Sequence, residues 1–100
     1  MSKIDTEQAS MDVQSLRRLR KQRIISRVEY YSGVSLIHEE LRDQARARVL
    51  ENGYSPEAQS EYMYFEKEFN RFKAKEYQAK QIQAEEAYEN ELKNLTRMYQ

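Results

Sequence analysis

The stretch Glu51-Asn52-Gly53-Tyr54-Ser55-Pro56-Glu57-Ala58 divides the chain in two and decides its fold. Asn52 and Gly53 tolerate a positive φ, which suits the end of a helix. Ser55 is a good N-cap, Pro56 fits the first helical position, and Glu57 places an acid at the positive end of the helix dipole. The stretch therefore predicts a helix that ends near residue 51, a turn at 52–55 and a second helix from residue 56.

The second helix is expected to run over about 56–98, because residues 57–100 contain neither Gly nor Pro and are mostly good helix formers. At 1.5 Å per residue such a helix is about 60 Å long. Its apolar residues form two stripes whose centres differ by roughly a quarter turn. One straight partner cannot cover both, so the two halves of this helix should pack on different surfaces. The first stripe comprises Ala58, Tyr62, Phe65, Phe69 and Phe72, and the second Tyr77, Ala84, Tyr88, Leu92, Leu95 and Tyr99.

Upstream of the turn, the helical pattern covers about 6–51, with Asp5-Thr6 or Ser10 as the cap. The pair Ser32-Gly33 interrupts it, since a glycine inside a helix costs about 1 kcal/mol relative to alanine. The pattern is compatible with one long helix kinked at 32–34 or with two shorter helices, and it slightly favours the kink.

These elements predict an all-α fold, a long antiparallel helical hairpin with coiled-coil-like packing. The apolar face of 34–49 would lie on the first stripe, with Leu41 near Phe65 or Phe69. The sequence predicts one helical domain, 1–100. Within it, residues 1–9 are a candidate flexible stretch, residues 10–51 form a basic helical arm and residues 56–100 form a long acidic helix. Two helices make a thin core, so self-association or a protein partner is expected. The expected intrachain core is Ile37, Leu41, Ala45, Tyr62, Phe65, Phe69 and Phe72.

Composition excludes several classes of protein. The 100 residues include no Cys, which leaves neither a disulfide framework nor a thiolate metal site. Charged residues make up 34% of the chain, and the mean hydropathy is −1.05. No stretch of the sequence approaches the roughly 20 apolar residues that a membrane span needs. The first residues show no apolar segment typical of a signal peptide. The expected location is the cytoplasm or an assembled particle.

Charge is balanced over the whole chain but uneven along it. Residues 1–50 carry ten basic and seven acidic side chains, and residues 51–100 carry seven basic and ten acidic ones. The basic segment, residues 17–27, could contact the phosphates of a nucleic acid, an anionic membrane surface, an acidic protein or the chain's own acidic half. No recognised nucleic-acid motif surrounds it. Its cations are Arg17, Arg18, Arg20, Lys21, Arg23 and Arg27.

Residues that could perform catalysis are scarce. His38 has no second histidine at helical spacing, so neither the metalloprotease nor the di-iron pattern is present, and no metal or other cofactor is expected. The acidic cluster of Glu85, Glu86, Glu89 and Glu91 resembles a solvated helix face rather than a carboxylate pair separated by burial. The sequence therefore predicts neither an enzyme nor a small-molecule binder.

The expected function is that of a non-enzymatic structural, assembly or adaptor protein that docks into a larger complex, such as a phage particle or a secretion-type assembly. Burial of aromatic residues would supply affinity and the charges would set register. A nucleic-acid-binding or host-regulatory role through the basic segment is the alternative. The expected protein interface consists of Tyr77, Tyr88, Leu92, Leu95 and Tyr99.

Overall fold

The computed structural model describes residues 4–99, and in that range the chain consists of helices joined by two short connections, without strands. The helices are α1 (Thr6–Lys21), α2 (Arg27–Glu51) and α3 (Pro56–Met98). The expectation of an all-helical chain is confirmed. Of the stretch 1–9, residues 1–3 lie outside the described part, as does residue 100. Ile4 and Ala9 pack against Leu41 and Ala45 of α2, and the Asp5 side chain caps α1, whereas residues 5–8 are exposed.

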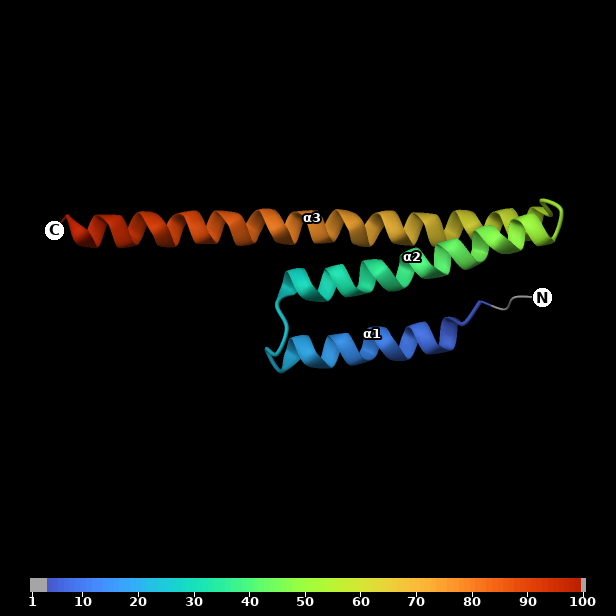
Figure 1. Cartoon of the computed structure of the whole chain (residues 1–100), viewed down its shortest axis with the longest axis horizontal. Coiled ribbons are helices and arrows are strands. Elements are labelled where there is room, and N and C mark those ends of the chain that lie inside the picture. Colours follow the sequence, from blue (N-terminus) through green and yellow to red (C-terminus); the bar gives the residue numbers. More distant parts are fainter. Residues whose placement is uncertain (1–3, 100) are drawn as a thin grey trace.

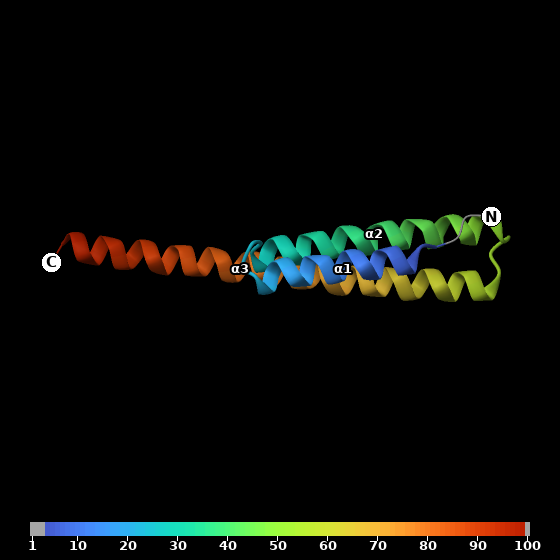
Figure 2. The same ribbon diagram turned by 90° about the horizontal axis from the view of Figure 1, so that it is seen from below.

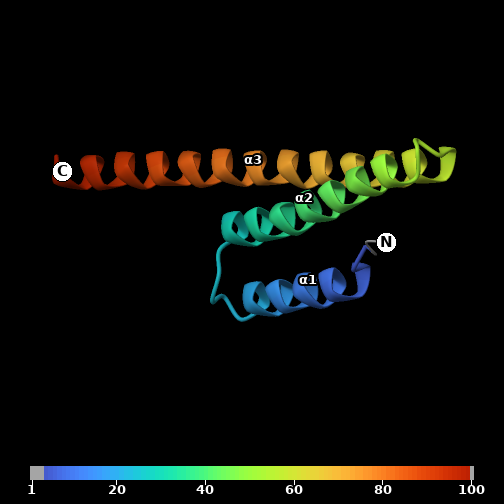
Figure 3. The ribbon, with the colours of Figure 1, turned by 45° about the vertical axis from the view of Figure 1, so that its right-hand side comes forward.

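The three helices form an elongated molecule of 69 × 24 × 13 Å. In Figure 1, α2 doubles back beside the first half of α3, and α1 returns along the other side of α2. The turned view in Figure 3 shows the same order, with α2 in the middle. Figure 2 shows that the second half of α3 extends alone, beyond the ends of both other helices. The molecule is therefore a short helical body with a long protruding helix.

The connection between α2 and α3 lies where the sequence places it. Asn52 caps α2, and Gly53 follows with a φ of 61°, which glycine adopts without steric cost. The Tyr54 amide donates to the Val49 carbonyl at 2.9 Å, which completes a Schellman ending. The Ser55 hydroxyl accepts a hydrogen bond from the Ala58 amide at 3.3 Å, and Pro56 begins α3.

The kink or break expected at 32–34 is wrong, because the chain turns at 22–26 instead. The Arg23 amide donates to the Arg20 carbonyl at 3.0 Å and the Ile24 amide to the Leu19 carbonyl at 2.9 Å, a Schellman ending in which Arg23 has a φ of 60°. Ser26 then starts α2 through a capping box with Glu29, whose two hydrogen bonds are each 3.1 Å long.

Gly33 lies inside the continuous helix α2 and serves the packing of α1. A Cβ atom at Gly33 would stand 2.8 Å from Cδ1 of Leu16 on α1. That separation is too short for an ordinary contact, so the glycine allows α1 to approach α2 closely. The interruption in the sequence pattern marks a helix contact rather than a helix end.

The core is small and centres on α2. Ile4, Leu41 and Ala45 form a buried cluster, against which Ile37 and Phe65 pack. Of the seven residues expected in the core, Leu41 and Ala45 are buried and the rest are half-buried. The Arg42 guanidinium lies 4.4 Å from the ring centre of Phe69, and the rings of His38 and Phe72 are 4.5 Å apart. Polar side chains thus cover the outer part of the α2–α3 contact. The half-buried members are Ile37, Tyr62, Phe65, Phe69 and Phe72.

Candidate protein-docking surface

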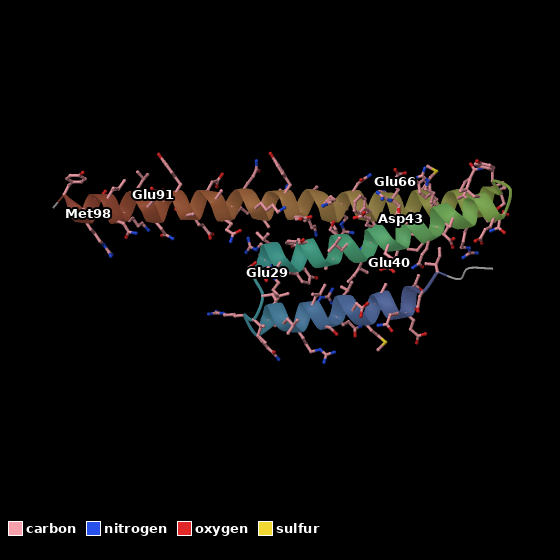
Figure 4. All side chains as sticks on the ribbon, viewed as in Figure 1. Glu29, Glu40, Asp43, Glu66, Glu91 and Met98 are labelled. Carbon is pink, nitrogen blue, oxygen red and sulfur yellow. The ribbon has the colours of Figure 1, made fainter. Side chains whose placement is uncertain are left out.

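The protruding part of α3, called here the overhang, comprises residues 80–99. Ala79 is the last buried residue of α3, and every residue from Lys80 to Tyr99 is exposed. In Figure 4, Glu91 and Met98 lie on this part of the helix with no other ribbon near them. Most helical stability in proteins comes from tertiary packing of an apolar face, which this segment lacks. The overhang is the part of the described chain that lacks tertiary support.

Of the five residues expected to form a protein interface, four lie on one exposed face of α3, and Tyr99 is the cap residue that follows its last turn. Tyr77 is 64% exposed although Glu76 and Ala79, on either side of it, are buried against α2. The interface face therefore points away from α2. It continues along the overhang through residues at helical spacing, namely Tyr88 (62% exposed), Leu92 (45%), Leu95 (44%) and Tyr99 (87%). These five residues and Ala84 are called the apolar stripe below.

The surface of the apolar stripe is uneven rather than flat. A shallow hollow of about 430 Å³ lies on it, lined by Ala84, Glu85, Tyr88, Glu89 and Leu92. The small Ala84 side chain leaves room beside the larger Tyr88 and Leu92. A hollow of this kind can receive a bulky apolar side chain from another helix.

Glu76 stabilises α3 at the point where the overhang begins. Its carboxylate lies 3.2 Å from Nζ of Lys73 and 3.2 Å from Nζ of Lys80. Burial raises the pKa of this carboxyl group, but the hydrogen bonds from Lys80 and Lys73 outweigh burial, so that its pKa is lowered from 4.5. These ion pairs connect the last covered turn of α3 to the first residue of the overhang.

The basic segment does not form one continuous helix. Four of its cations lie in the last turns of α1, where the negative end of the helix dipole stabilises positive charge. They are Arg17, Arg18, Arg20 and Lys21. Arg23 lies in the connection at 22–26 and Arg27 begins α2. The expected basic helical arm over 10–51 is therefore two helices with a turn inside the basic segment.

One cation of the basic segment is committed to the fold. The Arg20 guanidinium lies 5.0 Å from the ring centre of Tyr30 and 5.4 Å from that of Tyr31, and Arg20 is half-buried. The other five cations are exposed, and the ion pairs recorded among residues 4–99 involve other residues. Five of the six predicted contacts therefore remain accessible to an anionic partner.

The acidic cluster of the overhang is not neutralised by the basic segment. Glu85, Glu86, Glu89 and Glu91 are exposed, and none of them belongs to those ion pairs. The two segments approach each other at one place, a hollow of about 220 Å³ lined in part by Arg27, Ile82 and Glu86. Ile82 is 40% exposed and lies on the side of α3 that faces α2. It was not among the expected interface residues.

His38 has a structural place in the helix pair. Its Nδ1 lies 2.9 Å from the Val34 carbonyl oxygen, to which it can only donate, and its ring packs against Phe72. Among residues 4–99, no group of three or more His, Asp or Glu side chains is arranged to hold a metal ion.

The docking of α1, and the groove that this docking creates, were not predicted from the sequence. The groove, of about 410 Å³, lies between α1 and α3 and is floored by α2. Val13 and Arg17 line it from α1, Ile37 and Leu41 from α2, and Phe72 from α3. Two signals for a third helix were present, the capping box at Ser26 and the glycine opposite Leu16.

No helix in the described range is both long enough and apolar enough to cross a membrane. Comparison of the chain with protein-family models, with curated proteins and with solved structures gives no match.

Proposed function

We propose that this chain is a non-enzymatic helical structural, assembly or adaptor protein that docks into a larger protein complex through the apolar stripe of α3. The observation that supports the proposal is the combination of an unsupported helix with a regular apolar face. Aromatic residues are enriched at the centres of protein interfaces, and Tyr in particular supplies large contact area at low entropic cost. Three of the six residues of the stripe are Tyr.

The same proposal accounts for the form of the molecule. The helical body would act as an antiparallel, coiled-coil-like anchor that holds α3 at its base, and the overhang would reach into a neighbouring subunit. A phage particle or a secretion-type assembly is the kind of complex in which such a contact would serve. Such a chain would act in the cytoplasm or within an assembled particle, and we expect it to act as an oligomer or in a complex.

A charge-reversal experiment on the stripe tests this function. The full chain is produced at its native level in its own cells, and the size of the complex that contains it is measured by size exclusion of the extract. The double variant Leu92→Glu, Leu95→Glu places two acids in the stripe. The control, Asn90→Glu, Asn94→Glu, places two acids on exposed positions of the same stretch outside the stripe.

We expect the wild-type chain and the control to elute within a complex, and the stripe variant to elute as the free 12.1 kDa chain. Elution of the wild-type chain as a free species would contradict the proposal. A second candidate is favoured by the five exposed cations of the basic segment. It predicts instead a nucleic-acid complex that Arg17→Ala, Arg18→Ala releases and the stripe variant retains.

A further inference from the structure

The spacing of residues along the apolar stripe is symmetric, and this symmetry indicates which partner fits it. The six residues of the stripe share their face of α3 with the polar residue Gln81. These seven positions follow one another in steps of four, three and four residues, and then again in steps of four, three and four. This spacing reads the same from either end and is centred on Tyr88. We propose that a second copy of this chain covers the stripe in the antiparallel direction, with a two-fold axis at Tyr88. The proposal rests on the proposed function, namely that the stripe is a docking surface. The seven positions are Tyr77, Gln81, Ala84, Tyr88, Leu92, Leu95 and Tyr99.

In this arrangement each layer of the interface joins residues that fit one another. Tyr88 meets Tyr88 of the second copy on the axis, Ala84 meets Leu92, and Tyr77 meets Tyr99. Gln81 lies opposite Leu95 and can turn its amide to water at the edge. Large residues opposite small ones interdigitate well, and the hollow beside Ala84 receives Leu92 of the second copy.

A parallel pair in register fits the same residues less well. It would set Ala84 against Ala84 and leave a void, and it would place the two Gln81 side chains in one layer without an apolar partner. It would also align the two helix dipoles, whereas an antiparallel pair opposes them. The antiparallel pair is therefore the arrangement that these residues favour.

The geometry of α3 allows contact along the whole stripe. A repeat of eleven residues corresponds to three turns of 3.67 residues, so the stripe stays on one side of a nearly straight helix. Figure 1 shows that α3 is straight over this length. Tyr77 and Tyr99 are about 33 Å apart along the axis, which is the length of the proposed contact.

The helical body does not obstruct the second copy. Glu76 and Ala79 face α2 and are buried, whereas Tyr77 between them is exposed on the other side of α3. The end of the second copy's helix can therefore lie beside Tyr77 without meeting α2. The two bodies would then stand at opposite ends of the dimer, on the outer faces of the paired helices.

Charge and area are consistent with a reversible dimer. Lys80, which also pairs with Glu76 of its own helix, lies on the same flank as Glu91 of the second copy, about 7.5 Å further along the axis, within reach of two long side chains. A buried aromatic removes roughly 150–250 Å² from water, so the pair would bury on the order of 1,000 Å² in total. That is close to the lower limit of about 1,200 Å² for specific interfaces, so the dimer should dissociate on dilution.

Because the chain contains no Cys, single cysteines can report this register directly. The experiment uses the purified full chain with Tyr88→Cys, Tyr77→Cys, Tyr99→Cys and, as a control on the opposite face of the overhang, Glu86→Cys. Each variant is oxidised alone, and the Tyr77 and Tyr99 variants are also oxidised as a mixture. The yield of disulfide-linked dimer is read on a non-reducing gel, with helicity checked by circular dichroism.

We expect Tyr88→Cys to cross-link with itself at least tenfold more than Glu86→Cys. The mixture of Tyr77→Cys and Tyr99→Cys should cross-link, whereas each of these variants alone should stay at the level of the control. To keep the stripe intact, Lys80→Cys and Glu91→Cys are also mixed and treated with a short bismaleimide, and the mixed dimer should again exceed either variant alone.

Two results would overturn the inference. Self-linking of Tyr77→Cys and of Tyr99→Cys would show a parallel pair, and yields at the level of the control for every variant and mixture would show that no second copy covers the stripe. If the second result is found while Leu92→Glu, Leu95→Glu still releases the chain from its cellular complex, another protein occupies the stripe. In that case the proposed function stands and the inference fails.

Discussion

At the scale of single residues, Glu76 links the helical body to the overhang. It is buried, and it pairs with Lys73 and Lys80 on either side along α3. Because its pKa in the folded chain is lowered below 4.5, the ionised form favours folding. Its contribution to stability is thus fully present above the unfolded pKa and is lost as the pH falls through the lower folded pKa.

We expect Glu76→Gln to lower the free energy of unfolding by about 1 kcal/mol at pH 7, because two ion pairs are lost, and to have a smaller effect at pH 3. Urea unfolding at both pH values measures the difference. Glu85→Gln, which changes an exposed carboxylate of the same helix, is the control and should change stability little at either pH. A difference between wild type and Glu76→Gln that is equal at pH 7 and pH 3 would show that the ionised carboxylate is not involved.

Residue-level signals also show where sequence reasoning succeeds and fails. The turn at 52–55 could be predicted, because Gly53, Ser55 and Pro56 each have a local preference that the structure uses. The turn at 22–26 could not be found in the same way, because its left-handed residue is Arg23, which rarely adopts that conformation. The capping box of Ser26 and Glu29 was the remaining signal for this turn.

At the scale of the helices, the packing of α1 on α2 depends on the contact between Leu16 and Gly33. We expect Gly33→Leu to destabilise the protein by about 1–3 kcal/mol, because the new side chain occupies the place of Leu16. Gly33→Ala should stay within about 1 kcal/mol of wild type, since a small shift of Leu16 offsets the gain in helix propensity. Urea unfolding gives the stability, and hydrogen exchange at residues 6–21 shows whether α1 has detached.

The double variant Gly33→Leu, Leu16→Ala is the matched control for this contact. Removing the Leu16 side chain should restore part of the lost stability and the protection of α1. If Gly33→Leu is more stable than wild type, the glycine acts only as a weak helix former, as the sequence alone indicated, and the proposed role in packing is wrong.

The helices also show why the faces of α3 could be predicted but the docking of α1 could not. The two stripes of α3 follow from spacing within one helix, and the structure places one against α2 and leaves the other exposed. The docking of α1 depends on a tertiary contact between residues 16 and 33. The spacing of apolar residues within α1, where cations share the apolar side, gives no sign of that contact.

At the scale of the whole molecule, the chain combines a thin three-helix body with an overhang that nothing in the described structure covers (Figure 2). The residues of the candidate docking surface could be named from the sequence, because exposure of one helical face follows from the spacing. The partner that covers this surface could not be inferred from the spacing of residues within α3. Such an inference also needs the direction in which the stripe points relative to α2, and tertiary packing sets that direction. The groove between α1 and α3 was missed for the same reason as the docking of α1.

The central claim is that protein covers the apolar stripe when the chain functions, and amide hydrogen exchange tests it most directly. The measurement compares residues 81–98 in the chain purified from its own cells under native conditions with the same residues in Leu92→Glu, Leu95→Glu. An uncovered helix of this length opens readily, so its amides exchange fast. We predict slow exchange in the wild-type chain and fast exchange in the variant, with residues 34–49 protected in both. Equally fast exchange of residues 81–98 in both proteins would contradict the account.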